Sequence, residues 1–217
     1  SVLSHGGYFD TAVALLLAFD CFLRAGELVA IRHCDVADTG DLRLGPSSKG
    51  MSLRIPVAKT GTNQFVSIAR NSVKRLLRSV MKGKQGTQLL FPFCSKTLLS
   101  RFKAGCKLLG LSDSYVVHSL RHGGATHAHL HGHSVEDILL RGRWASTKSA
   151  RIYIQSGKAL LLSMQIPEKV QSLIPLLSAD VYHAICQPQL PPPPSHLPTT
   201  LTTPTKPRSP PAGAPTP

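Results

Sequence analysis

Basic and aromatic residues recur along this chain in a combination that suits phosphodiester chemistry. Arg24 comes first, the run His118-Ser-Leu-Arg121-His122 follows, and the segment Arg141-Gly-Arg-Trp144 leads to Tyr153. An arginine fork binds phosphate oxygens in pairs and keeps its charge, while a tyrosine hydroxyl can attack phosphorus once its proton is removed or its phenolate is stabilised. These residue types indicate a site in which a protein hydroxyl attacks a phosphate.

The overall charge points to an acidic partner. The chain has 217 residues, enough for one or two domains, with a formal net charge of +14 and a pI near 10.0. Lysine and arginine side chains that neutralise phosphates release counterions, which gives affinity without sequence preference. Membrane surfaces also attract basic proteins, but no signal peptide is recognisable, and the eight residues of the longest apolar stretch, Ala12–Phe19, fall short of the roughly 20 needed to cross a bilayer.

Cysteine usage and the C-terminal composition indicate the compartment and the domain limits. Five cysteines without a CxxC pair indicate neither a disulfide framework nor a zinc ribbon, so we expect a reducing, intracellular compartment. Residues 188–217 hold 12 of the 17 prolines and no aromatic or acidic residue, which predicts a disordered, Pro-rich tail after one domain at residues 1–187. Because a helical pattern begins almost at Ser1, we expect an upstream part to be missing.

The coarse pattern of residues 1–187 is mainly helical with a small sheet, an α+β fold. Apolar residues over Phe9–Ile31 predict one or two buried helices with a break near Arg24. Three β-like runs follow at residues 41–45, 52–57 and 64–69, and the last two flank turn residues, so that Lys59 lies in a hairpin loop. Further helices are expected at residues 71–81 with Asn71 as N-cap, and at 96–109, 119–130, 135–140 and around Tyr153.

Together these motifs resemble the tyrosine recombinases, the phage-integrase-type site-specific recombinases, over roughly residues 5–175. The spacing carries the resemblance: His118 lies three residues before Arg121, Trp144 lies 23 after it, and Tyr153 lies nine after Trp144. The other matching motifs are Leu23-Arg24-Ala-Gly-Glu27-Leu28, the hairpin lysine Lys59 and Gly-Arg-Trp144. The resemblance implies the catalytic-domain fold of that family, with a small three-stranded antiparallel sheet.

The resemblance also implies a role for most of these residues. Tyr153 would attack phosphorus and form a 3′-phosphotyrosyl bond, while Arg24 and Arg121 hold the nonbridging oxygens. His118 would accept the tyrosine proton or bond to it. Trp144 stands where many relatives have histidine, and its indole N–H can donate to a phosphate oxygen without exchanging protons. No metal or other cofactor is implied, because the two arginines do what divalent ions do elsewhere, and no ATP is needed, because the covalent bond conserves the energy of the broken one.

Two lysines and one carboxylate complete this set. The resemblance gives Lys59 the role of protonating the leaving 5′-oxygen, and Lys49, on the preceding loop, is its rival. Glu27, three residues after Arg24, would orient that arginine and its turn.

The resemblance further implies double-stranded DNA as the substrate and integration or recombination of DNA as the reaction. A homotetramer on DNA would form by exchange of a C-terminal helix, for which residues 158–186 are the candidate; an intramolecular helix is the alternative. The protein would act with DNA inside the cell, in a nucleus or in a bacterial cytoplasm. One departure from the family pattern is Gly123-Gly124, which predicts a looser helix start after His122.

Plain structural explanations remain open for each residue taken alone. Arg24 could complement the dipole at a helix end, and Lys59 could be a solvated turn lysine. Arg121 could pair with Glu136, and Trp144 could fill a gap in the core.

A cluster of histidines at His127, His129, His131 and His133 stands apart from these motifs. His127 and His131 are four residues apart on a predicted helix and could bind zinc. No cysteine or carboxylate lies nearby with ligand spacing, so we expect no metal and a histidine-rich helix face near DNA instead.

Three other functions compete with recombination. A type IB topoisomerase shares the arginine, lysine, histidine and tyrosine chemistry but relaxes supercoils as a monomer. A domesticated DNA-binding protein could keep the fold without the activity, although no active-site position is lost here. An RNA-binding module is the weakest alternative, because aromatic-rich strand motifs are missing.

Overall fold

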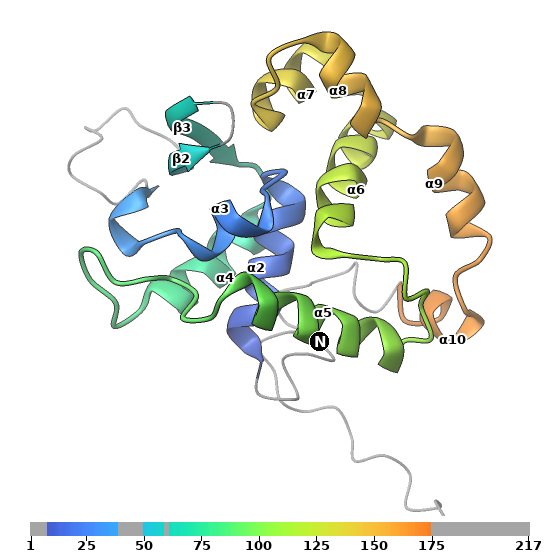
Figure 1. The fold of residues 1–217 in the computed structure, drawn as a ribbon, viewed down its shortest axis with the longest axis horizontal. Coiled ribbons are helices and arrows are strands. Elements are labelled where there is room, and N and C mark those ends of the chain that lie inside the picture. The colour runs from blue at the N-terminus through green and yellow to red at the C-terminus, as the bar shows by residue number, and fades with distance from the viewer. Residues whose placement is uncertain (1–7, 39–49, 59–60, 175–217) are drawn as a thin grey trace, which may run out of the picture.

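A computed structural model describes residues 8–38, 50–58 and 61–174 of this chain. Within these ranges, helix α2 lies between a three-stranded sheet and a group of C-terminal helices (Figure 1). The predicted α+β fold, mainly helical with a small antiparallel sheet, is confirmed. None of the helices described is long and apolar enough to span a bilayer.

The N-terminal apolar run forms two helices with a break between them, as predicted. Helix α2 (Phe9–Asp20) is buried on several sides because it contacts both α4 and α6. Helix α3 (Ala25–Val29) begins after Arg24, whose backbone is extended. Within the break, Phe22 has a left-handed backbone (φ 50°), which is strained for a bulky side chain and turns the chain sharply towards α3.

The sheet has the order β1-β2-β3, with both neighbouring pairs antiparallel. Its strands are β1 (Val36–Asp38), which follows the 3₁₀ turn η1 (His33–Asp35), β2 (Met51–Ala58) and β3 (Gly61–Ile68). The predictions for β2 and β3 are confirmed, although β3 begins three residues earlier than expected. The strand expected at residues 41–45 lies outside the described residues. The first strand was missed because three residues are too few to show an alternating pattern.

The remaining helices follow the predicted order, with boundaries within two residues of those expected as far as Leu130. They are α4 (Asn71–Met81), α5 (Ser95–Leu108), α6 (Val117–Leu130), α7 (Val135–Gly142), α8 (Thr147–Tyr153), α9 (Ser156–Ser163) and α10 (Glu168–Gln171). The prediction of Asn71 as an N-cap is wrong: Arg70 takes that position, and its side chain makes no capping bond. A single helix from residue 158 is also wrong, since Pro167 separates α9 from α10. Residues 175–186 and the Pro-rich tail lie outside the described residues.

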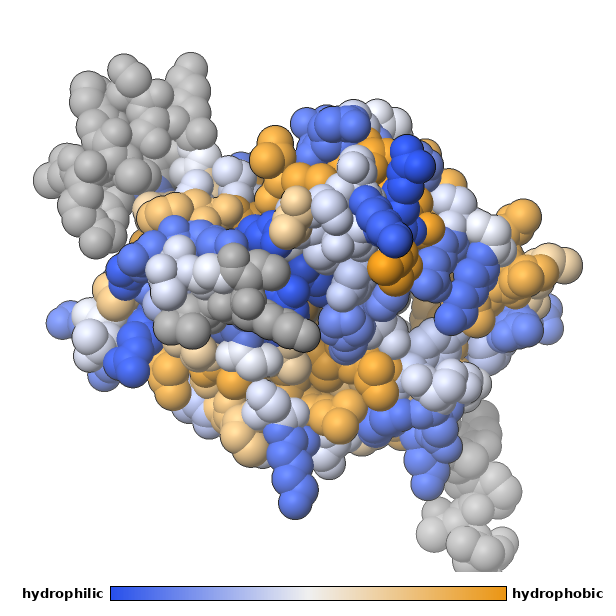
Figure 2. All heavy atoms as spheres, turned by 45° about the horizontal axis from the view of Figure 1, so that its top comes forward, coloured by the Kyte–Doolittle hydropathy of each residue, from blue (hydrophilic) through white to orange (hydrophobic). Residues whose placement is uncertain are grey.

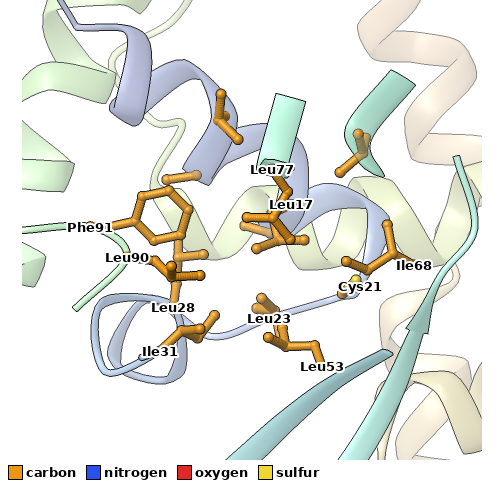
Figure 3. Packing of buried hydrophobic residues seen from close by; sticks show 14 of the residues in the cluster. Leu17, Cys21, Leu23, Leu28, Ile31, Leu53, Ile68, Leu77, Leu90 and Phe91 are labelled. Carbon is orange, nitrogen blue, oxygen red and sulfur yellow. The ribbon is translucent and has the colours of Figure 1, made fainter. Parts of the chain in front are cut away.

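Within the described ranges, the buried apolar side chains form two separate groups. The main core joins α2 to the break, to α3 and α4, and to the sheet, as Figure 3 shows for its central residues. Its labelled members are Leu17, Cys21, Leu23, Leu28, Ile31, Leu53, Ile68, Leu77, Leu90 and Phe91. A smaller site cluster contains Phe22, Ala125, Ile138, Trp144 and Ala150, with Tyr153 packed against it.

Gly124 allows α6 to approach α2 closely. A Cβ atom at Gly124 would overlap the carbonyl oxygen of Phe19 and lie 2.7 Å from the ring of Phe22. The expected loosening of the helix start is not found, because α6 begins at Val117 and runs unbroken through both glycines. The glycine pair therefore serves helix packing rather than flexibility.

Candidate active site

Tyr153, the last residue of α8, lies among the other predicted site residues of α6 and the α7–α8 turn. Its ring centroid is 4.4 Å from that of His122, 4.6 Å from that of Trp144 and 5.7 Å from that of His118. The guanidinium carbon of Arg121 is 5.4 Å from the centre of the tyrosine ring. The structure thus brings together four predicted residues that are up to 35 positions apart in the sequence.

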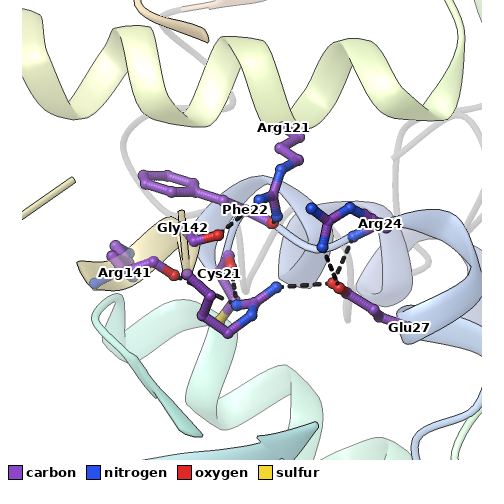
Figure 4. Close-up of polar contacts among 8 residues, drawn as sticks. Cys21, Phe22, Arg24, Glu27, Arg121, Arg141 and Gly142 are labelled. Atoms are coloured by element: carbon purple, nitrogen blue, oxygen red, sulfur yellow. Dashed lines mark hydrogen bonds and ion pairs between the residues drawn. The ribbon is translucent and has the colours of Figure 1, made fainter. Parts of the chain in front are cut away.

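Arg121 enters this group from α6 with a fully buried side chain. Its Nη1 donates to the carbonyl of Phe22 and its Nη2 donates to the carbonyl of Gly142 at 2.6 Å (Figure 4). Its guanidinium carbon also lies 4.6 Å from the centre of the Trp144 ring. The alternative pairing with Glu136 is wrong, since Arg121 bonds to the carbonyls of Phe22 and Gly142, which carry no formal charge.

Arg24 lies beside Arg121 and is held by Glu27, as expected (Figure 4). The Nη1 of Arg24 donates to Glu27 Oε1 at 2.7 Å, and the backbone N–H of Arg24 donates to Glu27 Oε2 at 2.9 Å. The arginine side chain keeps 22% of its surface exposed, whereas the carboxylate keeps 4%. Glu27 therefore fixes the start of α3 and leaves part of Arg24 accessible.

Arg143, which the sequence analysis left without a role, is the third arginine of the group. Its side chain is 3% exposed, and its Nη2 donates to Glu27 Oε2 at 2.7 Å. Its backbone is left-handed (φ 56°) at the C-cap of α7. This contact could not be predicted, because it joins residues 116 positions apart and depends on that backbone conformation.

The turn that carries Arg143 and Trp144 is fastened to the end of α2. Arg141 donates twice to the carbonyl of Asp20, at 2.8 and 2.6 Å. A Cβ atom at Gly142 would overlap the Trp144 ring, so only glycine allows this ring position. Arg121 binds the same turn from α6 through the carbonyl of Gly142.

Thr126 fixes the position of Tyr153 from the next turns of α6. Its hydroxyl donates to the carbonyl of Tyr153 at 3.1 Å and accepts from the backbone N–H of Gln155 at 3.0 Å. The threonine is buried, so these bonds are shielded from water. Sequence reasoning missed this residue, because nothing separates it from the other threonines of the chain.

Burial and charge set the protonation states of the group. Burial, followed by the charges of Arg24 and Arg143, lowers the pKa of Arg121 to about 10, so this guanidinium stays charged at neutral pH. Partial desolvation, together with Arg121 and Arg24, lowers the pKa of His118 below its ordinary 6.5. Desolvation and His118 do the same to the pKa of His122. Both imidazoles are therefore neutral at pH 7.

The buried nitrogens of the group that have no hydrogen-bond partner among the described residues include Arg121 Nε, His122 Nδ1 and Trp144 Nε1. Buried polar atoms in folded proteins are nearly always paired, because an orphaned one costs free energy. Two of these atoms, on Arg121 and Trp144, are N–H donors. Their arrangement favours an anion that accepts from them.

Lys59 and its rival Lys49 lie outside the described residues. The strands that flank Lys59 can nevertheless be placed: Gln64 and Phe65 of β3 line a surface hollow of about 340 Å³ together with Arg143 and Trp144. Strand β3 therefore lies beside the turn that carries Trp144.

Two members of the histidine cluster, His127 and His131, contact each other, and His127 also contacts Arg70. The Nε2 of His127 lies 2.9 Å from Arg70 Nη2, and its ring centroid lies 3.9 Å from that of His131. No group of three or more His, Cys, Asp or Glu side chains within the described ranges is placed to hold a metal ion.

Comparisons with known proteins agree with this fold. The structure is similar to the XerH site-specific recombinase bound to its difH substrate (16% identity, TM-score 0.54), covering 68% of this chain and 42% of that one. It is also similar to the XerA recombinase (17% identity, TM-score 0.55), covering 76% of this chain and 59% of that one. A third similar structure is the Tn1549 transposon integrase in complex with circular intermediate DNA (14% identity, TM-score 0.53), covering 71% of this chain and 58% of that one. This chain thus spans only about half the length of those proteins, and at such identities the likeness concerns the fold.

The sequence comparisons settle the family. No curated protein sequence matches the chain. The model of the phage integrase family, however, matches residues 5–159, which include every predicted site residue from Arg24 to Tyr153. The resemblance inferred from the motifs is confirmed: this chain belongs to the phage integrase family.

Proposed function

We propose that this chain is the catalytic domain of a site-specific tyrosine recombinase, which cuts and rejoins DNA strands through Tyr153. One observation carries the proposal: the tyrosine ring packs against the buried guanidinium of Arg121, with the partly exposed Arg24 beside it. A phenol beside the Arg121 guanidinium can attack a phosphate that both arginines hold. Membership of the phage integrase family supports the same chemistry.

The negative charge that develops on the phosphate during the reaction can be stabilised by hydrogen-bond donors of the group. The phenol oxygen of Tyr153 attacks phosphorus, the bond to the 5′-oxygen breaks, and negative charge grows on the nonbridging oxygens. Arg24 and the unpaired Nε of Arg121 stabilise that charge, and Trp144 Nε1 donates a further hydrogen bond. The 3′-phosphotyrosyl bond keeps the energy of the broken bond, so that a 5′-hydroxyl can later attack it without ATP.

Two residues move the protons in this proposal. His118 is neutral at pH 7, and its ring forms a T-shaped pair with the tyrosine ring at 5.7 Å between centroids, which suits a base that accepts the phenol proton. Lys59 gives a proton to the leaving 5′-oxygen. The net result is a proton taken up from the nucleophile and a proton delivered to the leaving group.

The partners follow from the same proposal. Double-stranded DNA is the substrate, and the protein acts wherever the cell keeps its DNA. Helix α9 carries strongly exposed apolar residues, Leu160, Leu161 and Met164, and Figure 2 shows hydrophobic residues at the surface on that side. Unpartnered apolar side chains of this kind support exchange of the C-terminal helices within a homotetramer on DNA.

A covalent trapping experiment tests the proposal. The protein is incubated with duplexes that carry a nick and randomised arms, and the DNA that stays attached after denaturation is sequenced to find the substrate. Wild-type protein is expected to form the adduct and Tyr153→Phe to form none. An adduct that persists in Tyr153→Phe removes Tyr153 from the role of nucleophile.

Two further assays on the selected substrate define the reaction. Strand exchange between duplexes identifies a recombinase, whereas relaxation of supercoils without exchange identifies a topoisomerase. EDTA is expected to leave adduct formation unchanged, and strong inhibition by EDTA would contradict the metal-free mechanism.

A further inference from the structure

The buried carboxylate of Glu27 is shared between two arginines. Its Oε1 accepts from Arg24 and its Oε2 accepts from Arg143, each at 2.7 Å. Arg24 is partly exposed, while Arg143 and Glu27 each keep less than 5% of their side-chain surface exposed. Arg143 therefore contacts the carboxylate from within the protein, on the side away from solvent.

This sharing changes the charge that the site presents. A carboxylate that orients Arg24 by itself would also cancel its positive charge, which weakens the hold on a phosphate. Arg24, Arg121 and Arg143 supply three positive charges against the single negative charge of Glu27. The excess of two matches a phosphate attacked by a phenolate, which carries two negative charges in the transition state and one before the attack.

We propose that Arg143 is a positioning residue that neutralises Glu27, so that Glu27 orients Arg24 without cancelling the charge Arg24 directs at the phosphate. This inference rests on the proposed function. It assigns Arg143 no contact with the DNA, because its guanidinium is buried against Glu27.

A role in stability alone accounts poorly for an arginine at this position. The left-handed backbone at the end of α7 favours glycine, so arginine is strained there. A buried ion pair contributes little stability compared with apolar residues that fill the same space. Both costs are reasonable where the charge itself is needed.

The test asks whether the effect of Glu27→Gln on the cleavage rate changes sign when Arg143 is replaced. Single-turnover cleavage of the selected duplex is measured for wild type, Arg143→Met, Glu27→Gln and the double variant. Arg143→Met is expected to slow cleavage about 100-fold, the range for losing one charge stabiliser. Glu27→Gln slows the wild type, because Arg24 loses its ionic partner, yet the same change speeds Arg143→Met about tenfold because it restores the excess of two charges.

Each result decides the matter. Additive losses in the double variant, or cleavage by Arg143→Met at the wild-type rate, overturn the proposal. Arg143→Lys keeps the charge and covers the case in which Arg143→Met does not fold. If folded Arg143→Lys cleaves within about tenfold of the wild-type rate, the proposal is supported. If its cleavage is about 100-fold slower, as expected for a neutral residue, the proposal is contradicted. If wild-type protein forms no adduct at all, the proposed function is wrong. If wild-type protein forms the adduct but the variants give the contradicting results above, only the role of Arg143 is wrong.

Discussion

The main core and the site cluster are both buried, but they consist of different kinds of side chain. The main core consists of aliphatic and aromatic side chains that contact one another across α2, α3, α4 and the sheet. In the site cluster, Trp144 and Tyr153 pack against the guanidinium of Arg121 and the imidazole of His122. There the residues proposed to carry the chemistry also fill the interior, so a substitution acts on stability and on activity together.

The sharpest contrast compares Arg121→Met with Leu17→Ala. Losing Arg121 removes a proposed charge stabiliser, so cleavage of the selected duplex should slow by about 1000-fold or more. The variant also leaves the carbonyls of Phe22 and Gly142 without their donor, which should lower the free energy of unfolding by about 1–3 kcal/mol. Single-turnover kinetics and urea unfolding measure both effects.

Leu17→Ala is the control from the main core. It should lower the free energy of unfolding by about 2–5 kcal/mol, because it opens a cavity, while the folded fraction cleaves at the wild-type rate. Equal losses of cleavage in the two folded variants would erase the distinction between the regions.

Gly142→Ala tests whether the ring of Trp144 needs the space beside it. The added methyl group overlaps the indole and must displace it, so we expect cleavage to slow by about 100-fold, similar to loss of one hydrogen-bond donor at the charge. Gly157→Ala in α9 is the matched control, since nothing lies within 4 Å of its added Cβ atom. Tryptophan fluorescence should shift in the first variant and not in the second.

Thr126→Val probes how tightly the backbone of Tyr153 must be held. The change keeps the side-chain volume but removes both hydrogen bonds to the end of α8, and we expect roughly tenfold slower cleavage from a misplaced nucleophile. Thr126→Ser keeps the hydroxyl and should cleave nearly as wild type does. Equal rates for the serine and valine variants would show that the bonds do not position Tyr153.

The pH dependence should show the lowered pKa values of His118 and His122. Because the folded protein binds protons on these histidines less readily than the unfolded chain does, the free energy of unfolding should fall as pH drops below about 6.5 and level off once pH passes the folded pKa values. The cleavage rate should stay constant from neutral pH to below 6.5 and then fall as His118 becomes protonated.

His118→Gln separates the two histidines in this experiment. In that variant the acidic fall in cleavage rate should disappear, and the remaining rate should be low at every pH. An unchanged acidic fall would assign the titration to another group, with His122 as the next candidate.

The helices and two of the three strands could be predicted because their signals are local. Apolar spacing marked α2 and α4, and turn residues between two β-like runs marked the hairpin of β2 and β3. The first strand could not be predicted, since its three residues pair only through contact with β2. Likewise, the glycine pair of α6 was interpreted as loosening, because its packing against α2 is a tertiary contact.

In the candidate site, too, some residues could be predicted from local motifs, whereas others depend on tertiary contacts. Motif spacing identified Arg121, Trp144 and Tyr153, and the structure brings them into contact. Arg143 and Thr126 could not be identified, because their contacts depend on a left-handed turn and on the end of α8 meeting α6. The residues proposed to react could therefore be predicted from the sequence better than the residues that hold them in place.

The central claim is that the phenol oxygen of Tyr153 becomes bonded to a DNA phosphate. Protease digestion of the trapped adduct, followed by mass spectrometry, identifies the residue that carries the nucleotide and the end of the strand to which it is joined. The account predicts a 3′-phosphate on Tyr153 and a free 5′-hydroxyl on the released strand. A nucleotide on any other residue, or a 5′-phosphate linkage, would contradict it.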